Sequence, residues 1–142
     1  MTFKGKTLDE HDAVFWMGDL NYRLSELSIS REQVIQKCQN NDFKGLLKYD
    51  ELLKQKLVGG TFADYQEAEI NFGPTYKFEP GSTDWDESDK RRIPAWCDRI
   101  MFKSADKFKI ELVENSYESV TSVITSDHKP VKAMFVVKKK NL

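Results

Sequence analysis

Hydrophobic and polar positions follow two kinds of pattern along the chain. β-branched and aromatic residues run through "HDAVFWMG" to Gly18, which is typical of a strand buried on both faces. After Ser30, a candidate N-cap residue, apolar side chains recur at helical spacing, and a second helix is predicted in "FKGLLKYDELLKQKL". Later strands are predicted in "CDRIMFKS", "FKIELVENSY" and "HKPVKAMFVVKKK". This order predicts an α/β domain whose sheet joins distant segments.

Composition narrows the classes of function. The 142 residues are 39% hydrophobic and 32% charged, which predicts one soluble globular domain. A net charge of −1 provides no overall field for nucleic acid or an anionic membrane, so anion binding must come from local clusters. Cys38 and Cys97 have neither disulfide-framework nor zinc spacing, and residues 1–10 contain no apolar signal sequence. We therefore expect a reducing, cytoplasmic location.

The first candidate for chemistry is "GDLN", at the end of the first predicted strand. Asp19 and Asn21 are two residues apart, so their side chains would share one face of a continuing strand. A carboxylate can orient or deprotonate a water molecule, and a neighbouring amide can donate to an oxyanion. A simple Asx turn after the strand explains the same residues equally well.

Asp98 and His128 are the next candidates. Asp98 lies at the start of a predicted strand in "PAWCDRI", where a buried acid needs a partner. A histidine from a neighbouring strand would provide one and would fix the imidazole tautomer, whereas Arg92 or Arg99 would provide an ion pair instead. His128 lies in "SDHKP", and His11 is interpreted as a surface residue before the first strand.

Two further features are ambiguous when taken alone. Cys97 is followed by Arg99 after one residue, whereas cysteine phosphatases place five residues between the two, so Cys97 is interpreted as a core residue. Arginine and lysine side chains suit phosphate groups, but they more often form a solvated face. The basic set near Tyr76 comprises Lys77, Lys90, Arg91 and Arg92. Lys138–Lys140 form a solvated tail that allows a weak peripheral membrane contact.

Four segments in this order closely resemble the signature blocks of a known family. They are "FWMGDLNYRL", "PTYKFE", "IPAWCDRIMF" and "TSDHKPV". From about residue 10 the chain resembles the inositol polyphosphate 5-phosphatases, in the branch of the type II enzyme and the Lowe-syndrome protein. "GDLN" and "SDH" are shared with the wider superfamily of deoxyribonuclease-I-like endonucleases, whereas "PAWCDRI" and "PTYK" are more specific. The resemblance implies part of a deoxyribonuclease-I-like two-sheet α/β sandwich.

The resemblance also implies a role for each matching residue. Asp19 matches the acid that positions or activates the attacking water, and Asn21 matches the amide that contacts the scissile phosphate. His128 matches the histidine that holds the phosphate, and Asp98 matches the partner of that histidine. Asp127 matches an acid close to the metal and the phosphate, so it is the candidate metal ligand of this chain.

A second group of positions matches the recognition of the neighbouring 4-phosphate in this family. These positions are Tyr76, Lys77 and Lys90, with Arg92 as a further candidate. Binding energy from a remote phosphate can be used to orient the reacting one. Tyr22 and Arg23 continue the first motif and are interpreted as pocket-lining or structural.

The activity implied is that of a magnesium-dependent phosphomonoesterase. It removes the 5-phosphate from phosphoinositide lipids or soluble inositol polyphosphates by a metal-assisted attack of water, in the cytoplasm or at the cytosolic face of membranes. Family catalytic domains are longer, and residues 1–142 are expected to be the C-terminal half of one. The main Mg²⁺ ligands of the family and a second histidine are expected in the N-terminal half.

Two further hypotheses fit parts of the same sequence. A catalytically inactive fragment would keep the basic set and bind inositol phosphates or a protein partner without turnover. A nuclease of the same superfamily would share "GDLN" and "SDH", but the net charge and the more specific blocks argue against a nucleic-acid partner. Magnesium-dependent turnover would exclude the first of these, and nicking of plasmid DNA would support the second.

Overall fold

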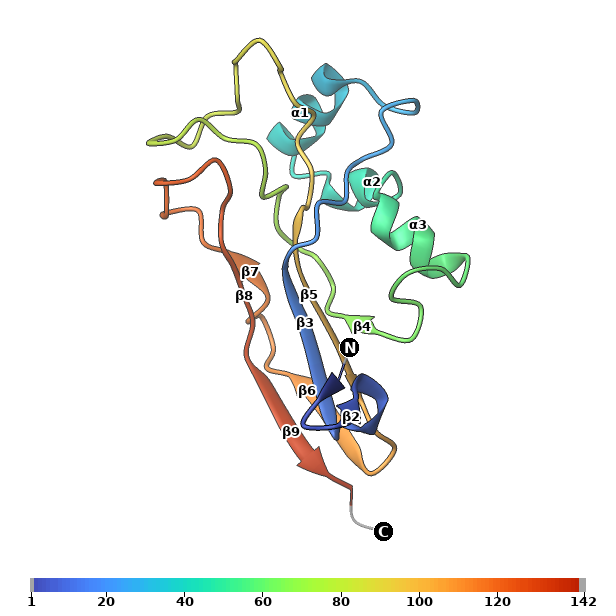
Figure 1. Cartoon of the computed structure of the whole chain (residues 1–142). Helices are drawn as coiled ribbons and strands as arrows, with labels where there is room; N and C mark the ends of the chain where they lie inside the picture. The colour runs from blue at the N-terminus through green and yellow to red at the C-terminus, as the bar shows by residue number, and fades with distance from the viewer. Residues whose placement is uncertain (1, 141–142) are drawn as a thin grey trace.

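In the computed structural model, which describes residues 2–140, three helices follow the first long strand and precede most of the others (Figure 1). The α-helices are α1 (Arg31–Gln39), α2 (Phe43–Leu47) and α3 (Glu51–Leu57), and a 3-10 helix covers Leu8–Glu10. The strands are β1 (Thr2–Phe3), β2 (Lys6–Thr7), β3 (Ala13–Asp19), β4 (Gln66–Glu67), β5 (Asp98–Ser104), β6 (Phe108–Leu112), β7 (Glu118–Ser119), β8 (Val131–Lys132) and β9 (Phe135–Lys139).

The strands form small antiparallel sheets that pack on one another. The central sheet has the order β3-β5-β4, while β6 pairs with β9 and β7 pairs with β8. Aromatic rings join the central sheet to β9. The ring of Phe135 lies 5.1 Å from that of Phe15 and 5.0 Å from that of Phe102, centroid to centroid. The expected joining of distant segments is confirmed, because β3 and β5 pair along their whole length.

The first long strand lies at the edge of its sheet. Within residues 2–140, β3 has β5 on one side and no strand on the other. Trp16 is 38% exposed and Met17 is 60% exposed. The prediction that this strand is buried on both faces is therefore wrong. Hydrophobic composition predicts a strand, but it does not state how many neighbours the strand has.

The helices begin at hydrogen-bonded caps. The side chain of Ser30 accepts a hydrogen bond from Gln33 N, and Gln33 Oε1 accepts one from Ser30 N, so the predicted N-cap is confirmed as a capping box. The predicted second helix is two helices. Asp50 has an extended backbone and caps α3 by accepting from Leu53 N at 2.9 Å, so the single-helix prediction is wrong at this residue.

The main core supports the start of β5. Ala95, Trp96 and Cys97, directly before this strand, are completely buried. The Trp96 indole N–H donates to the carbonyl oxygen of Phe72 at 2.9 Å. Around them pack Leu24, Ile29, Val34, Leu46, Ile70 and Ile100. The first residue of β5, Asp98, therefore directly follows a closely packed segment of the core, which fixes its position.

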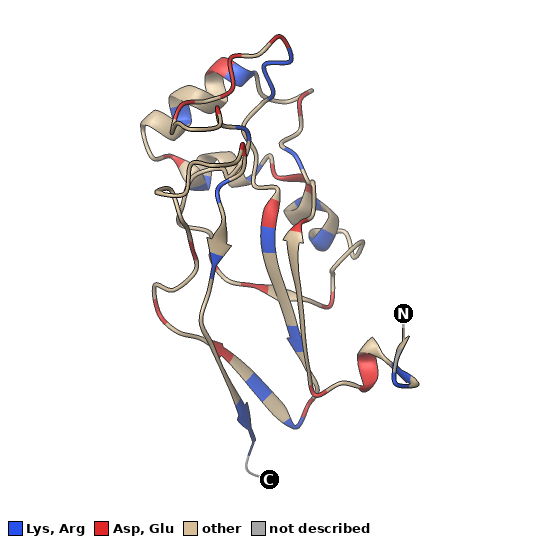
Figure 2. Ribbon diagram, turned by 60° about the vertical axis from the view of Figure 1, so that its left-hand side comes forward, with Lys and Arg blue, Asp and Glu red and all other residues tan. Residues whose placement is uncertain are grey.

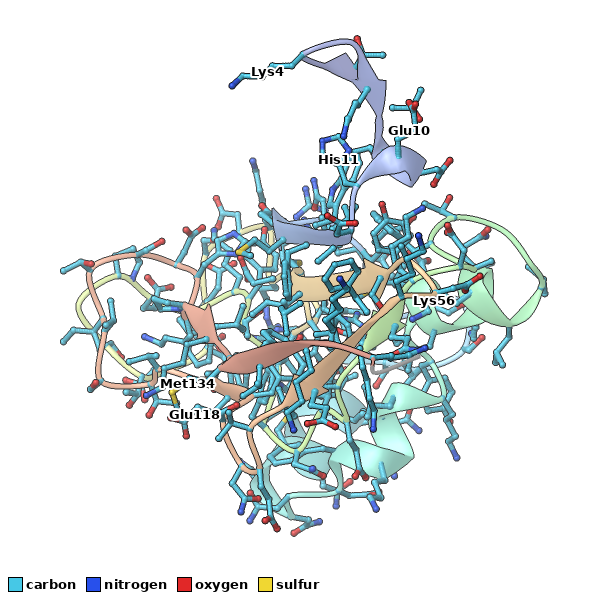
Figure 3. All side chains as sticks on the ribbon, turned by 90° about the horizontal axis from the view of Figure 1, so that it is seen from below. Lys4, Glu10, His11, Lys56, Glu118 and Met134 are labelled. Carbon is cyan, nitrogen blue, oxygen red and sulfur yellow. The ribbon has the colours of Figure 1, made fainter. Side chains whose placement is uncertain are left out.

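The N-terminal segment projects away from this body. Figure 2 shows it standing apart from the sheets, and Figure 3 shows Lys4, Glu10 and His11 on the projecting side. His11 Nδ1 lies 2.7 Å from the carbonyl oxygen of Thr7, so the ring is engaged within this same segment. Across residues 2–140, every helix is too short or too polar to span a bilayer.

Candidate active site

Two neighbouring strands place two acids opposite each other. Asp19 is the last residue of β3 and Asp98 is the first residue of β5, and they are partners in the antiparallel register. Directly opposed residues project to the same face of a sheet, with Cβ atoms about 5 Å apart. The strand pairing, which the sequence does not reveal, therefore brings the "GDLN" and "PAWCDRI" blocks together.

Asn21 lies in a turn beyond the strand. Its φ angle of 58° is in the left-handed region, which asparagine tolerates better than most residues. Its backbone N–H donates to Asp19 Oδ1 at 2.9 Å, so the Asx turn that was one of two explanations for "GDLN" is present. The expectation of one shared strand face is wrong, because β3 ends at Asp19. The turn keeps Asn21 close to Asp19 by another route.

Asp98 has a histidine as its partner. His128 Nδ1 lies 2.8 Å from Asp98 Oδ2, and the Thr75 hydroxyl donates to the same oxygen at 2.7 Å. Arg99 does not pair with this acid, because successive side chains of a strand point to opposite faces. The alternative left open by the sequence is thus decided in favour of the Asp98–His128 pair. Such a pair fixes the ring orientation and leaves Nε2 for chemistry.

The second ring nitrogen of His128 faces Asp19. The distance from His128 Nε2 to Asp19 Oδ2 is 3.9 Å, which is too long for a direct hydrogen bond. One oxygen atom, of water or phosphate, can lie about 2.8 Å from both atoms. The two side chains are 25% and 49% exposed, so such an atom can enter from solvent. The geometry suits a shared contact with one small polar group.

Backbone pairing between two further blocks holds this histidine in place. Tyr76 forms an antiparallel bridge with His128, and their rings lie 4.6 Å apart, centroid to centroid. On either side of the bridge, Phe78 N donates to the Asp127 carbonyl oxygen, and Lys129 N donates to the Thr75 carbonyl oxygen. The "PTYK" and "SDHKP" blocks therefore lie side by side at the site.

The side chains at this site fit one side of the shell of a hard cation. Asp19, Asp98 and His128 each offer a ligand atom within 4.8 Å of the others. Carboxylate oxygens are what Mg²⁺ and Ca²⁺ prefer, but these ions take six or more ligands, and Asp98 Oδ2 is already bonded to His128. Asp127 is not in this group. Its role as a metal ligand stays a prediction.

Comparison with known proteins places the chain in a family. The family model "Endonuclease/Exonuclease/phosphatase family 2" matches residues 1–134. The chain belongs to this family. The match confirms the α/β fold class that the sequence motifs predicted, and it covers every candidate residue described above.

Individual proteins and solved structures are also similar to the chain. The chain is 42% identical over 129 residues to the mouse type II inositol 1,4,5-trisphosphate 5-phosphatase. It is 40% identical, with a TM-score of 0.80, to the inositol polyphosphate 5-phosphatase domain of SpSynaptojanin in complex with inositol (1,4)-bisphosphate and calcium. A Cimex nitrophorin, in a ferrous NO complex, is 34% identical with a TM-score of 0.79.

The three alignments cover nearly all of this chain but only a minor part of each relative. The chain is covered to 91%, 96% and 93% in the three alignments. The mouse enzyme is covered to 12%, the SpSynaptojanin domain to 38% and the nitrophorin to 44%. The chain thus corresponds to less than half of each relative's length.

The residues predicted to recognise a second phosphate are partly brought to the site. Tyr76 contacts His128, and the next residue, Lys77, places its ammonium 3.4 Å from Asp86 Oδ2. Lys90 and Arg92 lie on an exposed loop and, among residues 2–140, have no carboxylate partner. Figure 2 shows acidic and basic segments close together along the loops at the top of the view. The role of Tyr76, Lys77, Lys90 and Arg92 in phosphate recognition stays a prediction.

Asp86 anchors this loop. Its side chain is 2% exposed, and Arg31 from α1 donates to its carbonyl oxygen at 2.7 Å. Burial disfavours the carboxylate, but hydrogen bonds from Ser88 and the ammonium of Lys77 outweigh burial and lower the pKa of Asp86 to about 2. The basic loop is therefore fixed to α1 and to the "PTYK" segment.

This carboxylate predicts a pH dependence of stability. Because its pKa is lower in the folded state, Asp86 stabilises the fold above the unfolded pKa of about 4, and this contribution is lost as the pH falls toward 2. In Asp86→Asn, the free energy of unfolding is expected to change less with pH between 4 and 2. Urea unfolding of both proteins at several pH values measures the difference. If the free energy of unfolding changed equally with pH in both proteins, the lowered pKa of Asp86 would be wrong.

A buried charge cluster, absent from the sequence predictions, lies on the other face of β5. The fully buried Arg99 donates to both carboxylate oxygens of Asp50 at 3.0 and 2.9 Å and to both of Glu67 at 2.7 Å. Tyr117 also donates to Glu67. Burial lowers the pKa of Arg99, but the two carboxylates outweigh it and raise that pKa. The cluster fixes β5 next to Asp98, and its partners are too distant in the sequence for a motif to reveal.

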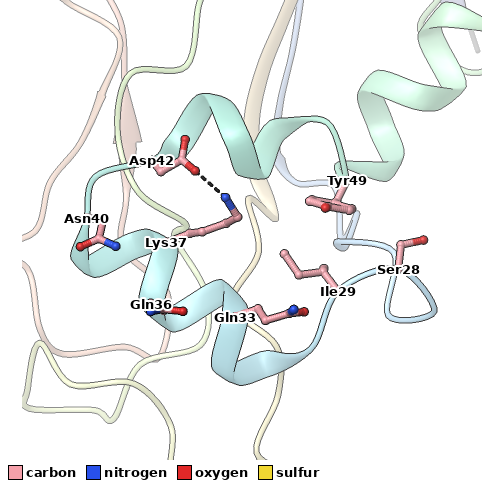
Figure 4. A pocket seen from close by; sticks show the side chains of 8 residues that line it. All are labelled: Ser28, Ile29, Gln33, Gln36, Lys37, Asn40, Asp42 and Tyr49. Carbon is pink, nitrogen blue, oxygen red and sulfur yellow. Dashed lines mark hydrogen bonds and ion pairs between the residues drawn. The ribbon is translucent and has the colours of Figure 1, made fainter.

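Two other features lie outside the candidate site. Cys97 is buried, and burial raises the pKa of its thiol to about 12, so its interpretation as a core residue is confirmed. A cavity of about 300 Å³ lies beside α1 and α2 (Figure 4). The charged pair in its wall, Lys37 and Asp42, is joined by a hydrogen bond. None of the predicted site residues lines this cavity.

Proposed function

We propose that this chain carries the water-activating and phosphate-binding part of an inositol polyphosphate 5-phosphatase site. The observation that carries the proposal is the approach of Asp19 to the Asp98–His128 pair, with a gap that one oxygen atom can fill. The similarity to a type II 5-phosphatase supports the reaction class. The inositol (1,4)-bisphosphate in the SpSynaptojanin structure supports the substrate class, since it is what remains after inositol 1,4,5-trisphosphate loses its 5-phosphate.

Each side chain has a separate task in this reaction. The Asp98 carboxylate accepts the Nδ1 proton of His128, which directs Nε2 toward the scissile phosphate. The Asp19 carboxylate positions and deprotonates the attacking water, and the amide of Asn21 donates to a phosphate oxygen. General-base action and one oxyanion donor each contribute about 10²- to 10³-fold or more to such reactions.

The proposed cofactor is Mg²⁺. Asp19 would contribute an oxygen to it, with Asp127 as a further candidate, and the remaining ligands would come from water, phosphate and other protein groups. When bound, the ion supplies positive charge beside the phosphate oxygens. The calcium ion in the SpSynaptojanin structure supports a hard divalent cation, and hard cations share the carboxylate donors present here.

Recognition of the rest of the substrate is assigned to the basic set. Tyr76 forms an isolated backbone bridge with the histidine, and Lys77 is the next residue, so both suit a phosphate adjacent to the reacting one. Lys90 and Arg92 lie on the anchored loop and are open to solvent. The substrate is a phosphoinositide lipid or a soluble inositol polyphosphate, and the lipid requires a peripheral membrane contact.

A product analysis tests this function. Inositol 1,4,5-trisphosphate in solution and phosphatidylinositol 4,5-bisphosphate in vesicles are each incubated with Mg²⁺ and either this chain or the longest natural polypeptide that contains it. We expect loss of the 5-phosphate, abolished by EDTA and restored by Mg²⁺. Loss of another phosphate, or no release by either polypeptide, would refute the proposal.

A binding protein without turnover is the second candidate. The similarity to a Cimex nitrophorin, solved as a ferrous NO complex, supports it, because one fold can serve different functions. Calorimetry with inositol (1,4)-bisphosphate distinguishes the two candidates. Binding by a polypeptide that releases no phosphate favours the second, whereas Mg²⁺-dependent release excludes it.

A further inference from the structure

Arg23 holds the amide side chain that the proposed reaction uses. Its Nε lies 3.1 Å from Asn21 Oδ1, and its Nη2 donates to the same oxygen at 2.5 Å. Both bonds come from one planar guanidinium, which presents its donors as a rigid fork. The amide oxygen of Asn21 is therefore bound on one side by two donors.

The chemistry of arginine fixes which way this amide points. A guanidinium has five N–H donors and no acceptor, so the asparagine atom that it contacts must be the carbonyl oxygen. The NH₂ group of Asn21 then points away from Arg23. The backbone of Asn21 is fixed separately, by the hydrogen bond from its N–H to Asp19 Oδ1. Main chain and side chain are thus both held.

Arg23 is itself fixed by an aromatic stack. Its guanidinium carbon lies 4.3 Å from the ring centroid of Tyr76, and the Tyr76 ring lies 4.6 Å from that of His128. A cation over a tyrosine ring is held by an attraction of about 0.5–2 kcal/mol. One chain of contacts therefore runs from Asn21 through Arg23 and Tyr76 to the catalytic histidine.

We propose that Arg23 is a positioning residue, which binds the amide oxygen of Asn21 so that the amide NH₂ group faces the scissile phosphate. This inference rests on the proposed function, because it takes the group that faces Asn21 to be the phosphate of a phosphate ester. Without Arg23, the amide can rotate by a half turn and present an oxygen, which repels a phosphate. Arg23 thus acts through Asn21, and its Nε and one Nη proton are not free to bind substrate.

A double-mutant cycle tests this role in the longest natural polypeptide that contains the chain. Arg23→Lys keeps the charge but loses the fork, and we expect kcat to fall about 10- to 100-fold with KM changed less than about 3-fold. In an Asn21→Ala background, the same substitution should lower kcat less than about 3-fold, because its target is gone. Lys44→Arg, which likewise exchanges one basic side chain for the other in an exposed ion pair with Glu69 away from the site, is the matched control and should leave both constants unchanged.

Asn21→Asp separates the amide donor from the contact with arginine. An aspartate at this position keeps an acceptor for Arg23 but has no NH₂ group, so kcat should fall as far as in Asn21→Ala. Equal losses from Arg23→Lys in the two backgrounds, or a loss confined to KM, would overturn the proposal. The latter result would mean that Arg23 binds the substrate itself.

A readout without turnover keeps this inference separate from the proposed function. The ¹⁵N side-chain signals of Asn21, identified by their loss in Asn21→Ala, are followed in the 142-residue chain while inorganic phosphate is added. We expect the NH₂ signals to shift with phosphate in the wild type and to lose this shift in Arg23→Lys. No shift in the wild type, or the same shift in both proteins, would overturn the proposal. Absence of phosphatase activity alone would refute only the proposed function.

Discussion

Asp19→Ala is expected to lower kcat for release of the 5-phosphate about 10²- to 10⁴-fold, the usual contribution of a positioned general base. The carboxylate is half-exposed, and its Oδ2 faces His128 Nε2 across a gap of 3.9 Å that one oxygen atom of the proposed reaction can fill. KM should change little, because the basic set that is proposed to bind the substrate is untouched. Initial rates at several substrate concentrations measure both constants.

The control for this variant is another acid on the same segment. Asp12 is exposed directly before β3 and lies at the opposite end of the strand from Asp19. Asp12→Ala should therefore keep wild-type kcat and KM. If Asp19→Ala kept full activity in a correctly folded protein, as judged by circular dichroism, the role given to Asp19 would be wrong.

Arg99→Met is expected to lower the free energy of unfolding by about 3–5 kcal/mol. The substitution leaves two buried carboxylates, Asp50 and Glu67, without the cation that they share. Asp50 also caps α3, and Glu67 lies in β4, so the loss extends to both of these elements. Urea denaturation at neutral pH measures the change.

Two further variants identify the origin of this loss. Combining Arg99→Met with Asp50→Asn and Glu67→Gln removes the unpaired charges and should restore part of the stability. Lys103→Met, which breaks the more exposed ion pairs of Lys103 with Asp9 and Asp64, should cost less than about 1 kcal/mol. A small effect of Arg99→Met, equal to that of Lys103→Met, would contradict the interpretation of the cluster.

The sequence predicted features of the fold and of the site that depend on short local patterns. The cap at Ser30 depends on residues three positions apart, so the local pattern was enough to predict it. The sequence alone predicts either a histidine or an arginine as the partner of Asp98. Which of the two pairs with Asp98 depends on the residues that strand pairing places next to it. Because side chains alternate along β5, Asp98 faces His128 and Arg99 faces the buried acids.

Features that depend on distant partners could not be predicted. The cluster around Arg99 joins residues 49 and 32 positions away, and no periodicity connects them. The break of the second helix depends on Asp50, which is a helix cap and also a partner of Arg99. The edge position of β3 is a property of the whole sheet rather than of its seven residues.

That edge position has a consequence for the behaviour of the chain in solution. Along Ala13–Asp19 the backbone groups directed away from β5 can be hydrogen-bonded only by water or by another strand. With Trp16 and Met17 exposed beside them, these groups form a template for strand addition. We therefore expect copies of the chain to associate through this edge in concentrated solution when no other strand occupies it, and the amide protons of β3 to exchange more slowly with solvent once it is occupied.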